Sequence, residues 1–261
     1  MLRILRIALL GLTTTALAMA TLETKTVRYD LDGTTFESTI VYDAHTAKPL
    51  PGILMVPNWM GPTENALEKA KMVAGYGYVV MITDMYGVDV RPTNGGEAAQ
   101  AAGFVRGDRA LMRARAAKGL EVLRGEGHDV GLDREKVAAI GFCFGGGTVL
   151  ELGRSGADLA AVVSFHGDLV SPTLEADAAN TQAKVLVLHG AADPYVPRAD
   201  VERFTAAMLA TEVDWQLVEY SQTVHSFTNP EAAAAGQSEY NPVSAARAFV
   251  AMRALLDEIW D

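Results

Sequence analysis

The fold is decided by the stretch Val137-AAIGFCFGG-Gly147, which carries Cys143 near its centre. Its apolar first half is typical of a buried β-strand, and a helical pattern from Thr148 to Gly153 follows the glycines at once. Gly-x-Cys-x-Gly between a strand and a helix is the arrangement of a nucleophile elbow, in which a serine usually takes the central position. The small residues at Gly141 and Gly145 allow strand and helix to approach closely.

Cys143 is the only cysteine in the chain, and its surroundings favour a reactive thiol. The helix that begins after it points its positive N-terminal end at the sulfur, which stabilises a thiolate. With a single cysteine the chain cannot form an intramolecular disulfide, so its stability depends on its core. The alternative interpretation is a buried, inert cysteine beside a glycine-rich turn. The strand before Cys143, the helix after it and two matches further along the chain favour the nucleophile.

Residues 1–20 have the pattern of a secretory signal peptide. Arg3 and Arg6 precede a short apolar stretch, and the segment ends in an Ala-x-Ala pattern at Ala20. The apolar stretch is too short to anchor the chain stably in a bilayer. We therefore expect cleavage after Ala20 or Ala18 and a periplasmic or secreted protein. The alternative is a disordered or docked N-terminal segment of a cytosolic protein.

Residues 21–261 are long enough for a single α/β domain with a sizeable core. The chain is 49% hydrophobic and 21% charged, as in a globular enzyme and unlike a disordered protein. Its net charge of −10 argues against binding to nucleic acid or to an anionic membrane surface. We expect neither a nucleic-acid nor a membrane partner, and a monomer or weak dimer.

Short apolar strands recur along the chain. Two alternating segments flank Asp32-Gly33, which is a hairpin signal, and the continuous apolar runs after them are typical of strands covered on both faces. The expected strands are Thr26–Asp30, Thr35–Tyr42, Ile53–Val56, Tyr78–Ile82, 137–141, Leu159–Phe165, Val185–Leu188 and Trp215–Tyr220.

Helical segments alternate with these strands. Besides the helix after Cys143, we expect Asn65–Tyr76, Glu97–Arg124 (either continuous or broken near Gly107), Arg198–Ala210 and Pro242–Ile259. Ala232–Ala235 with Gly236 is expected to be a loop, a lid or a helix fragment. The alternation predicts an α/β fold, with a mostly parallel central sheet and helices on both faces.

Two residues at the ends of later strands complete a catalytic arrangement. Asp193 lies in the loop after a buried strand, and His225 follows the last strand and precedes the last helix. The order nucleophile, acid, base matches that of the α/β-hydrolases. Cys143 would attack a carbonyl, His225 would transfer the proton and Asp193 would fix the imidazole tautomer. Taken singly, Asp193 is also typical of a turn or helix cap, and His225 of a solvated surface histidine.

The other histidines do not form a metal or cofactor motif. His45 and His128 stand in polar, turn-like surroundings, while His166 and His189 fall at strand ends near the expected cleft. They lack the spaced carboxylate or cysteine partners of a metal site, and no phosphate loop or dinucleotide fingerprint is present. We predict no metal and no cofactor. Charged residues expected at helix surfaces are Asp158, Glu151, Arg106, Arg109 and Arg113.

These segments together resemble the dienelactone hydrolase family, a branch of the α/β-hydrolase superfamily that uses a Cys-Asp-His triad. The resemblance rests on Gly-x-Cys-x-Gly-Gly, His189-Gly-x-x-Asp193 and Val224-His-Ser-Phe, and it covers about Val27 to Leu256. It implies a hydrolase of small carboxylic esters or lactones that acts through a thioester acyl-enzyme, with a small-molecule substrate as its partner.

The resemblance also implies an oxyanion hole made of two backbone N–H groups. One belongs to Phe144, directly after the thiol, and the other to Trp59 in the segment Pro57-Asn-Trp-Met-Gly61. The general geometry of the elbow predicts the same two donors.

The chain departs from the family's pattern at three positions. Asn58 stands where dienelactone hydrolases have a glutamate that helps to activate the thiol, and an amide cannot accept a proton as a carboxylate does. Val88 and Asn229 stand near the positions of the arginines that hold the substrate carboxylate. Asn58, Arg91 and Tyr86 are therefore candidates for thiol activation or substrate contact. We expect a neutral or differently anchored ester or lactone rather than dienelactone itself.

An exported small-molecule binding protein on the same fold is the alternative function, because a fold does not fix an activity. Asn58 and the expected export favour this alternative, whereas the set Cys143, Asp193 and His225 argues against it.

Overall fold

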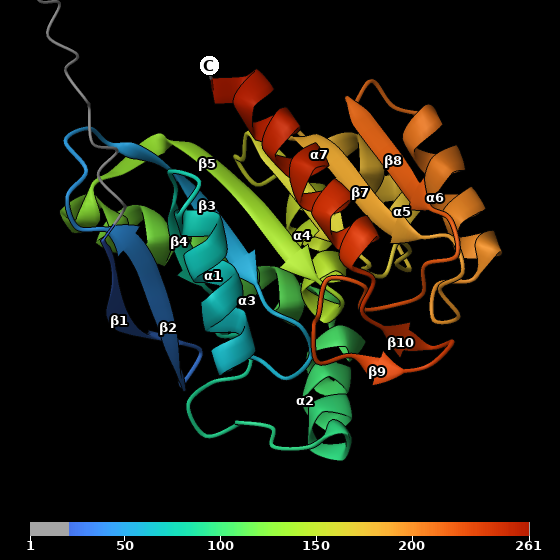
Figure 1. Cartoon of the computed structure of the whole chain (residues 1–261), viewed down its shortest axis with the longest axis horizontal. Coiled ribbons are helices and arrows are strands. Elements are labelled where there is room, and N and C mark those ends of the chain that lie inside the picture. The colour runs from blue at the N-terminus through green and yellow to red at the C-terminus, as the bar shows by residue number, and fades with distance from the viewer. Residues whose placement is uncertain (1–20, 261) are drawn as a thin grey trace, which may run out of the picture.

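The computed structural model describes residues 21–260 of the 261-residue chain. The expected signal peptide at residues 1–20 lies outside the described residues. An eight-stranded sheet in the order β1-β2-β4-β3-β5-β6-β7-β8 runs through the centre, with helices on both of its faces (Figure 1). The hairpin β1–β2 is antiparallel and pairs antiparallel with β4, and every pairing from β4 to β8 is parallel. The predicted α/β architecture with a mostly parallel sheet is confirmed.

The strands of the large sheet coincide with the eight predicted apolar segments and differ from them mainly in length. They are β1 Leu22–Leu31, β2 Thr34–Asp43, β3 Leu50–Val56, β4 Val79–Ile82, β5 Leu132–Phe142, β6 Ala161–Phe165, β7 Lys184–Gly190 and β8 Trp215–Tyr220. The helices are α1 Glu64–Ala74, α2 Gly95–Gly107, α3 Arg109–Glu126, α4 Phe144–Arg154, α5 Leu174–Asp177, α6 Arg198–Leu209 and α7 Pro242–Trp260, and two 3-10 turns span Gly127–Val130 and Ala178–Asn180. Among residues 21–260, no helix has the length and apolarity that a bilayer span requires.

Alternate residues of the central strands face two separate apolar cores. On β3, Leu54 packs into one core and Ile53 into the other, and both side chains are fully buried. Strands β4 and β6 are likewise buried along their whole length. The continuous apolar runs in the sequence arise because helices cover both faces of these strands.

The segment Glu97–Arg124 forms two helices, and the chain changes direction at Asp108. The Asp108 side chain caps α3 by accepting a hydrogen bond from the N–H of Leu111 at 3.0 Å. The Ala-rich segment near residue 232 is a small hairpin of β9 Ala233–Ala234 and β10 Ser238–Glu239. The expectation of a helix fragment there is wrong, because Gly236 turns the chain back with a positive φ of 71°.

Glu151 is buried, so the expectation that it lies on a helix surface is wrong. Its side chain is 1% exposed and accepts hydrogen bonds from Arg154 at 2.8 Å and from Arg113 of α3 at 2.9 Å. The reason is the position of α4, whose residues are all buried. A charge in such a helix must be paired, because an isolated buried charge would be very costly.

Candidate active site

Cys143 lies between the last residue of β5 and the first residue of α4, in a strained backbone conformation. Its φ of 54° and ψ of −116° fall where residues other than glycine are rare. Hydrogen bonds on both sides hold this conformation: the N–H of Cys143 donates to the carbonyl of Phe165 at 3.0 Å, and the N–H of Gly146 donates to the carbonyl of Cys143 at 2.9 Å. The strain therefore lies at the predicted nucleophile and is maintained by the neighbouring strand and helix.

The elbow requires glycine at two flanking positions. A Cβ atom on Gly141 would collide with the carbonyl of Gly145, and a Cβ atom on Gly145 would collide with the carbonyl of Val56 on β3. Helix α4 therefore packs directly against the ends of β5 and β3. This close approach aims the N-terminal end of α4 at the thiol.

The structure brings Cys143, His225 and Asp193 together, as the sequence predicts. Asp193 follows β7 with a fully buried side chain, and its Oδ2 atom lies 2.7 Å from Nδ1 of His225. Its Oδ1 atom accepts a hydrogen bond from the N–H of Tyr195 at 2.9 Å, which fixes the carboxylate. The Cys143 thiol lies close enough to His225 to contribute to the pKa of its imidazole.

The groups around His225 favour its charged form. Burial lowers the pKa of His225, but the hydrogen bonds to Asp193 and Cys143 and the negative charge of both groups outweigh it and raise the pKa to about 10. An imidazolium at neutral pH stabilises a thiolate beside it. The arrangement is that of a thiol beside an imidazole that a carboxylate orients.

His166 lies directly behind the thiol and supports the elbow. The N–H of Cys143 also donates to Nδ1 of His166 at 3.2 Å, and Nε2 of His166 lies 2.8 Å from Oγ1 of Thr228. Because Nδ1 accepts, Nε2 carries the hydrogen and donates to Thr228. Burial lowers the pKa of His166 well below its ordinary value, and the charges of His225 and Lys69 lower it further. From the sequence, the position of His166 at a strand end placed it near the cleft but did not indicate this role.

Tyr86 connects Trp59 and Phe144, the two residues whose backbone N–H groups are the predicted oxyanion hole. Phe144 is the first residue of α4, so its N–H has no acceptor within the helix. Tyr86 contacts both residues: its hydroxyl donates to the carbonyl of Trp59 at 2.9 Å, and its ring packs against that of Phe144 with centroids 5.7 Å apart. Tyr86 therefore fixes the loop that carries the Trp59 amide relative to the start of α4.

A cavity of about 320 Å³ opens onto Cys143, and we call it the thiol cavity. Asn58 lines it, and the Oδ1 atom of Asn58 accepts a hydrogen bond from the N–H of Met60 at 2.9 Å, so the amide NH₂ group is left for a ligand. The β9–β10 hairpin forms part of the wall, since Ala232 and Ser238 line the cavity. The other lining residues are Trp59, Met60, Thr63, Glu64, Asn65, Ser226, Asn229 and Glu231.

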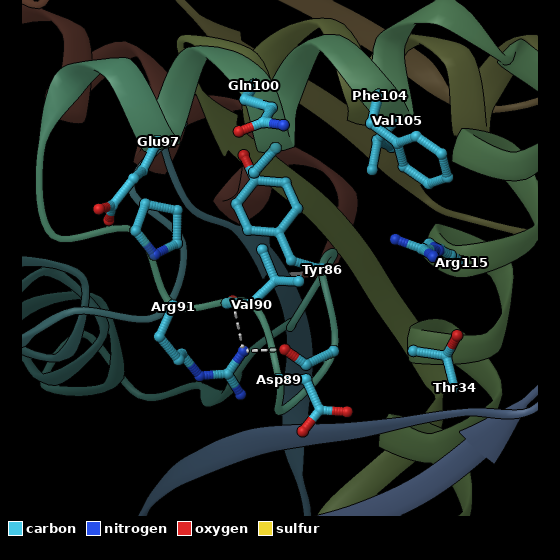
Figure 2. A pocket seen from close by; sticks show the side chains of 13 residues that line it. Thr34, Tyr86, Asp89, Val90, Arg91, Glu97, Gln100, Phe104, Val105 and Arg115 are labelled. Atoms are coloured by element: carbon cyan, nitrogen blue, oxygen red, sulfur yellow. Dashed lines mark hydrogen bonds between the residues drawn. The ribbon is translucent and has the colours of Figure 1, made fainter.

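Arg91 does not line the thiol cavity. Figure 2 shows it at the edge of a separate cavity of about 700 Å³, which Tyr86 also lines. Its guanidinium donates to Oδ2 of Asp84 at 2.9 Å and to the carbonyl of Gly87 at 2.5 Å. The Asp84 side chain is fully buried, and a buried carboxylate requires such a partner. Arg91 thus stabilises the loop after β4, and Val88 on that loop is absent from the thiol cavity as well.

The described residues contain no group of three or more His, Cys, Asp or Glu side chains that could hold a metal ion. The chemistry available at this site is that of a thiol, an imidazole, a carboxylate and backbone N–H groups.

Comparison with known proteins identifies relatives of the whole fold. A solved structure named m3DLH is 35% identical and superposes with a TM-score of 0.84 over 92% of this chain and 99% of that one. A dienelactone hydrolase-like promiscuous phosphotriesterase, P91, from metagenomic libraries is 34% identical, with a TM-score of 0.84 over 91% and 98% of the two chains.

Curated relatives match over shorter stretches. An uncharacterised Caenorhabditis elegans protein is 37% identical over 39% of this chain and 65% of its own length. A putative carboxymethylenebutenolidase of Yersinia pestis is 31% identical over 37% of this chain and 39% of its own length. The aligned part thus spans less than two thirds of either relative.

The family assignment rests on a match that extends over most of the chain. The model of the dienelactone hydrolase family matches residues 38–260, from the second strand of the sheet through the last helix. This span contains the elbow, the loop after β7 and the segment after β8. The chain belongs to the dienelactone hydrolase family.

Proposed function

We propose that this protein hydrolyses small carboxylic esters or lactones, with Cys143 as its nucleophile. The observation that carries the proposal is the buried pair of His225 and Asp193, joined at 2.7 Å, beside Cys143 in its strained elbow. Membership of the dienelactone hydrolase family supports it. A purely structural role for this half-buried cysteine would not require a buried histidine–aspartate pair beside it.

The reaction follows from this geometry. The thiolate of Cys143 attacks the substrate carbonyl, and the negative charge that forms on the carbonyl oxygen is stabilised by the N–H groups of Trp59 and Phe144. When the C–O bond breaks, the imidazolium of His225 gives its proton to the leaving alkoxide, and a thioester remains on the enzyme. His225 then takes a proton from water, which attacks the thioester, and the proton returns to the thiol as the acid is released.

The thiol cavity favours a neutral substrate. Its charged lining residues are Glu64 and Glu231, and neither lysine nor arginine lines it. A carboxylate would be repelled in such a cavity, because like charges at close range disfavour binding. We therefore propose a small neutral ester or lactone and not dienelactone, which carries a carboxylate. A neutral phosphotriester is a useful second probe, since the relative P91 is named as a promiscuous phosphotriesterase.

The test is a stopped-flow measurement with p-nitrophenyl acetate on the protein that begins at residue 21, under reducing conditions. The expected result is a burst of p-nitrophenolate followed by steady turnover, both absent in Cys143→Ala. A burst without turnover would show that the thiol is acylated but that the thioester is not hydrolysed. Asn58→Glu would then be the next variant. No reaction of the wild type with any neutral ester, lactone or phosphotriester would contradict the proposal and favour a binding protein.

We also propose that the protein acts outside the cytoplasm, on the basis of the signal-peptide pattern of residues 1–20. Fractionation of cells that express the full chain tests this. The mature protein is expected in the periplasm or medium, with its N-terminus at residue 19 or 21, and retention in the cytoplasm after deletion of residues 2–20 is the matched control. An uncleaved full chain in the cytoplasm would contradict export.

A further inference from the structure

A second cavity of about 490 Å³ lies between α1 and α7 and is distinct from the thiol cavity. Both helices pack on the same face of the sheet, since Ala70 of α1 and Met252 of α7 belong to one core (Figure 1). We call this the α1–α7 cavity. Its volume lies within the range of small-molecule sites. Its lining residues are Asn65, Glu68, Lys69, Met72, Tyr76, Thr228, Pro230, Tyr240, Pro242, Ala245, Ala246, Phe249, Val250 and Arg253.

The walls of the α1–α7 cavity are unusually apolar for a surface site. Ten large hydrophobic side chains are exposed within residues 21–260, and four of them line this cavity: Met72, Tyr76, Tyr240 and Val250. Pro242, Ala245, Ala246 and Phe249 of α7 extend the same surface. A concentration of exposed apolar side chains around a cavity is typical of a binding site.

Lys69 places a positive charge in this apolar setting. Its Nζ atom donates to Oδ1 of Asn65 at 2.9 Å and lies 5.6 Å from the centre of the Phe142 ring. No carboxylate lies within ion-pair distance of it among the described residues, whereas Lys71, on the same helix, pairs with Glu68 at 2.7 Å. Burial lowers the pKa of Lys69 to about 8, although the negative charge of Glu231 opposes this shift. The ammonium is partly desolvated and lacks a neutralising partner.

We propose that the α1–α7 cavity binds a small amphiphilic anion, whose carboxylate pairs with Lys69 and whose apolar body lies against Met72, Tyr76, Phe249 and Val250. The charge of the ligand complements the unneutralised ammonium, and its apolar part covers the exposed side chains. The thiol cavity is lined by two glutamates and no base, so the two cavities select ligands of different charge. This site is separate from the proposed hydrolysis and does not depend on it.

Two residues that line the α1–α7 cavity, Asn65 and Thr228, form hydrogen bonds with residues at the thiol site. Asn65 lines both cavities, and its Nδ2 atom donates to Oδ1 of Asn229 at 3.0 Å. Thr228 lines the α1–α7 cavity and is the partner of His166. A ligand that pairs with Lys69 competes with Asn65 for the ammonium. We therefore expect occupancy of the α1–α7 cavity to alter turnover at Cys143.

The test uses decanoate as the probe anion and isothermal titration calorimetry below its micelle concentration. We expect saturable binding of one decanoate per chain, weakened about tenfold or more in Lys69→Met, because a charge-assisted hydrogen bond is lost. Lys69→Arg restores the charge and most of the affinity. The control is Lys48→Met, which removes an exposed lysine that does not line the cavity and leaves binding unchanged. Decanol, which lacks the carboxylate, binds as weakly to the wild type as to Lys69→Met.

A second pair of variants locates the ligand. Val250 and Val243 are both exposed on α7, but only Val250 lines the cavity. Val250→Trp fills the cavity and should abolish binding, while Val243→Trp should not. The proposal is overturned if decanoate does not bind, if Lys69→Met binds as well as the wild type, or if Val250→Trp binds as well as Val243→Trp. It is also overturned if light scattering shows a wild-type dimer that Val250→Asp separates, because a second copy would then cover the cavity.

Discussion

The backbone N–H of Cys143 donates to Nδ1 of His166 at 3.2 Å, so the strained elbow is held by an imidazole that must remain neutral. A protonated His166 would have no acceptor for this N–H and would place a second cation beside the charged ring of His225, whose centroid lies 5.2 Å away. Burial accordingly holds the pKa of His166 well below its ordinary value. The elbow therefore depends on pH through a residue outside the triad.

Acid should destabilise the protein through His166. Its pKa is depressed in the folded state, so below about pH 6.5 only the unfolded chain takes up this proton and stability is lost. Urea denaturation should show that the free energy of unfolding falls between pH 6.5 and pH 5 by roughly 2 kcal/mol more in the wild type than in His166→Gln. His45→Gln, at an exposed position, is the control. Equal pH dependence in wild type and His166→Gln would contradict the assignment.

Removing the backbone strain at Cys143 should stabilise the fold. A positive φ suits glycine, so Cys143→Gly is expected to be more stable than Cys143→Ala by about 1 kcal/mol, although glycine gains entropy on unfolding. Both variants lack the thiol, so the comparison isolates the backbone. Thermal denaturation measures the difference, and a lower melting temperature for Cys143→Gly would show that the elbow is not strained.

A methyl group at the elbow should be far more costly than one at an open position on a helix. Gly145→Ala would push Cβ into the carbonyl of Val56, and we expect a loss of about 3 kcal/mol in the free energy of unfolding. Gly103→Ala is the matched control, because a Cβ atom on Gly103 of α2 meets nothing within 4 Å and alanine favours a helix. Equal stability of the two variants in urea would contradict the close contact between α4 and β3.

Loss of the Asp193 carboxylate should move the alkaline limb of the pH profile of kcat/KM to lower pH. The raised pKa of His225, about 10, keeps the imidazolium present at neutral pH, and the stability that this pairing contributes is complete below pH 6.5 and lost as the pH rises through 10. In Asp193→Asn the pKa of His225 falls, so the alkaline limb of kcat/KM moves to lower pH and the rate drops by about 10²-fold or more. An unchanged limb would mean that another group titrates there.

Arg91 should matter for stability and not for substrate binding. Arg91→Met leaves the buried carboxylate of Asp84 without its guanidinium, and we expect a loss of about 2 kcal/mol in urea denaturation. The KM for a neutral ester should stay unchanged, because Arg91 does not line the thiol cavity. A large rise in KM with unchanged stability would instead place Arg91 at the substrate.

The sequence predicted the features that depend on local patterns. Continuous apolar runs showed the buried strands, and the turn at Asp32-Gly33 has the positive φ values that the hairpin signal implies, 49° and 77°. The elbow was visible because its glycines and its cysteine adjoin in the chain. The order of Cys143, Asp193 and His225 along the chain led to three side chains that the structure does bring together.

What remained hidden depends on contacts between distant segments. Glu151 was expected on a surface because no pattern within α4 indicates its burial. The burial depends on α3, which supplies Arg113 as its partner. Arg91 was a candidate for substrate contact because the sequence does not show that Asp84, seven residues earlier, is buried. The buried carboxylate of Asp84 is the partner that holds the Arg91 guanidinium. The role of His166 requires knowledge that Thr228 lies at its other nitrogen.

The central claim is that Cys143 carries the acyl group, and acid-quenched intact-mass spectrometry tests it most directly. Mixing the protein with p-nitrophenyl acetate and quenching within the burst should give the wild type a mass increase of one acetyl group, and peptide mapping should place it on Cys143. The adduct should disappear as substrate is consumed, and Cys143→Ala should remain unmodified. An adduct on another residue, or an equal adduct on Cys143→Ala, would contradict the mechanism.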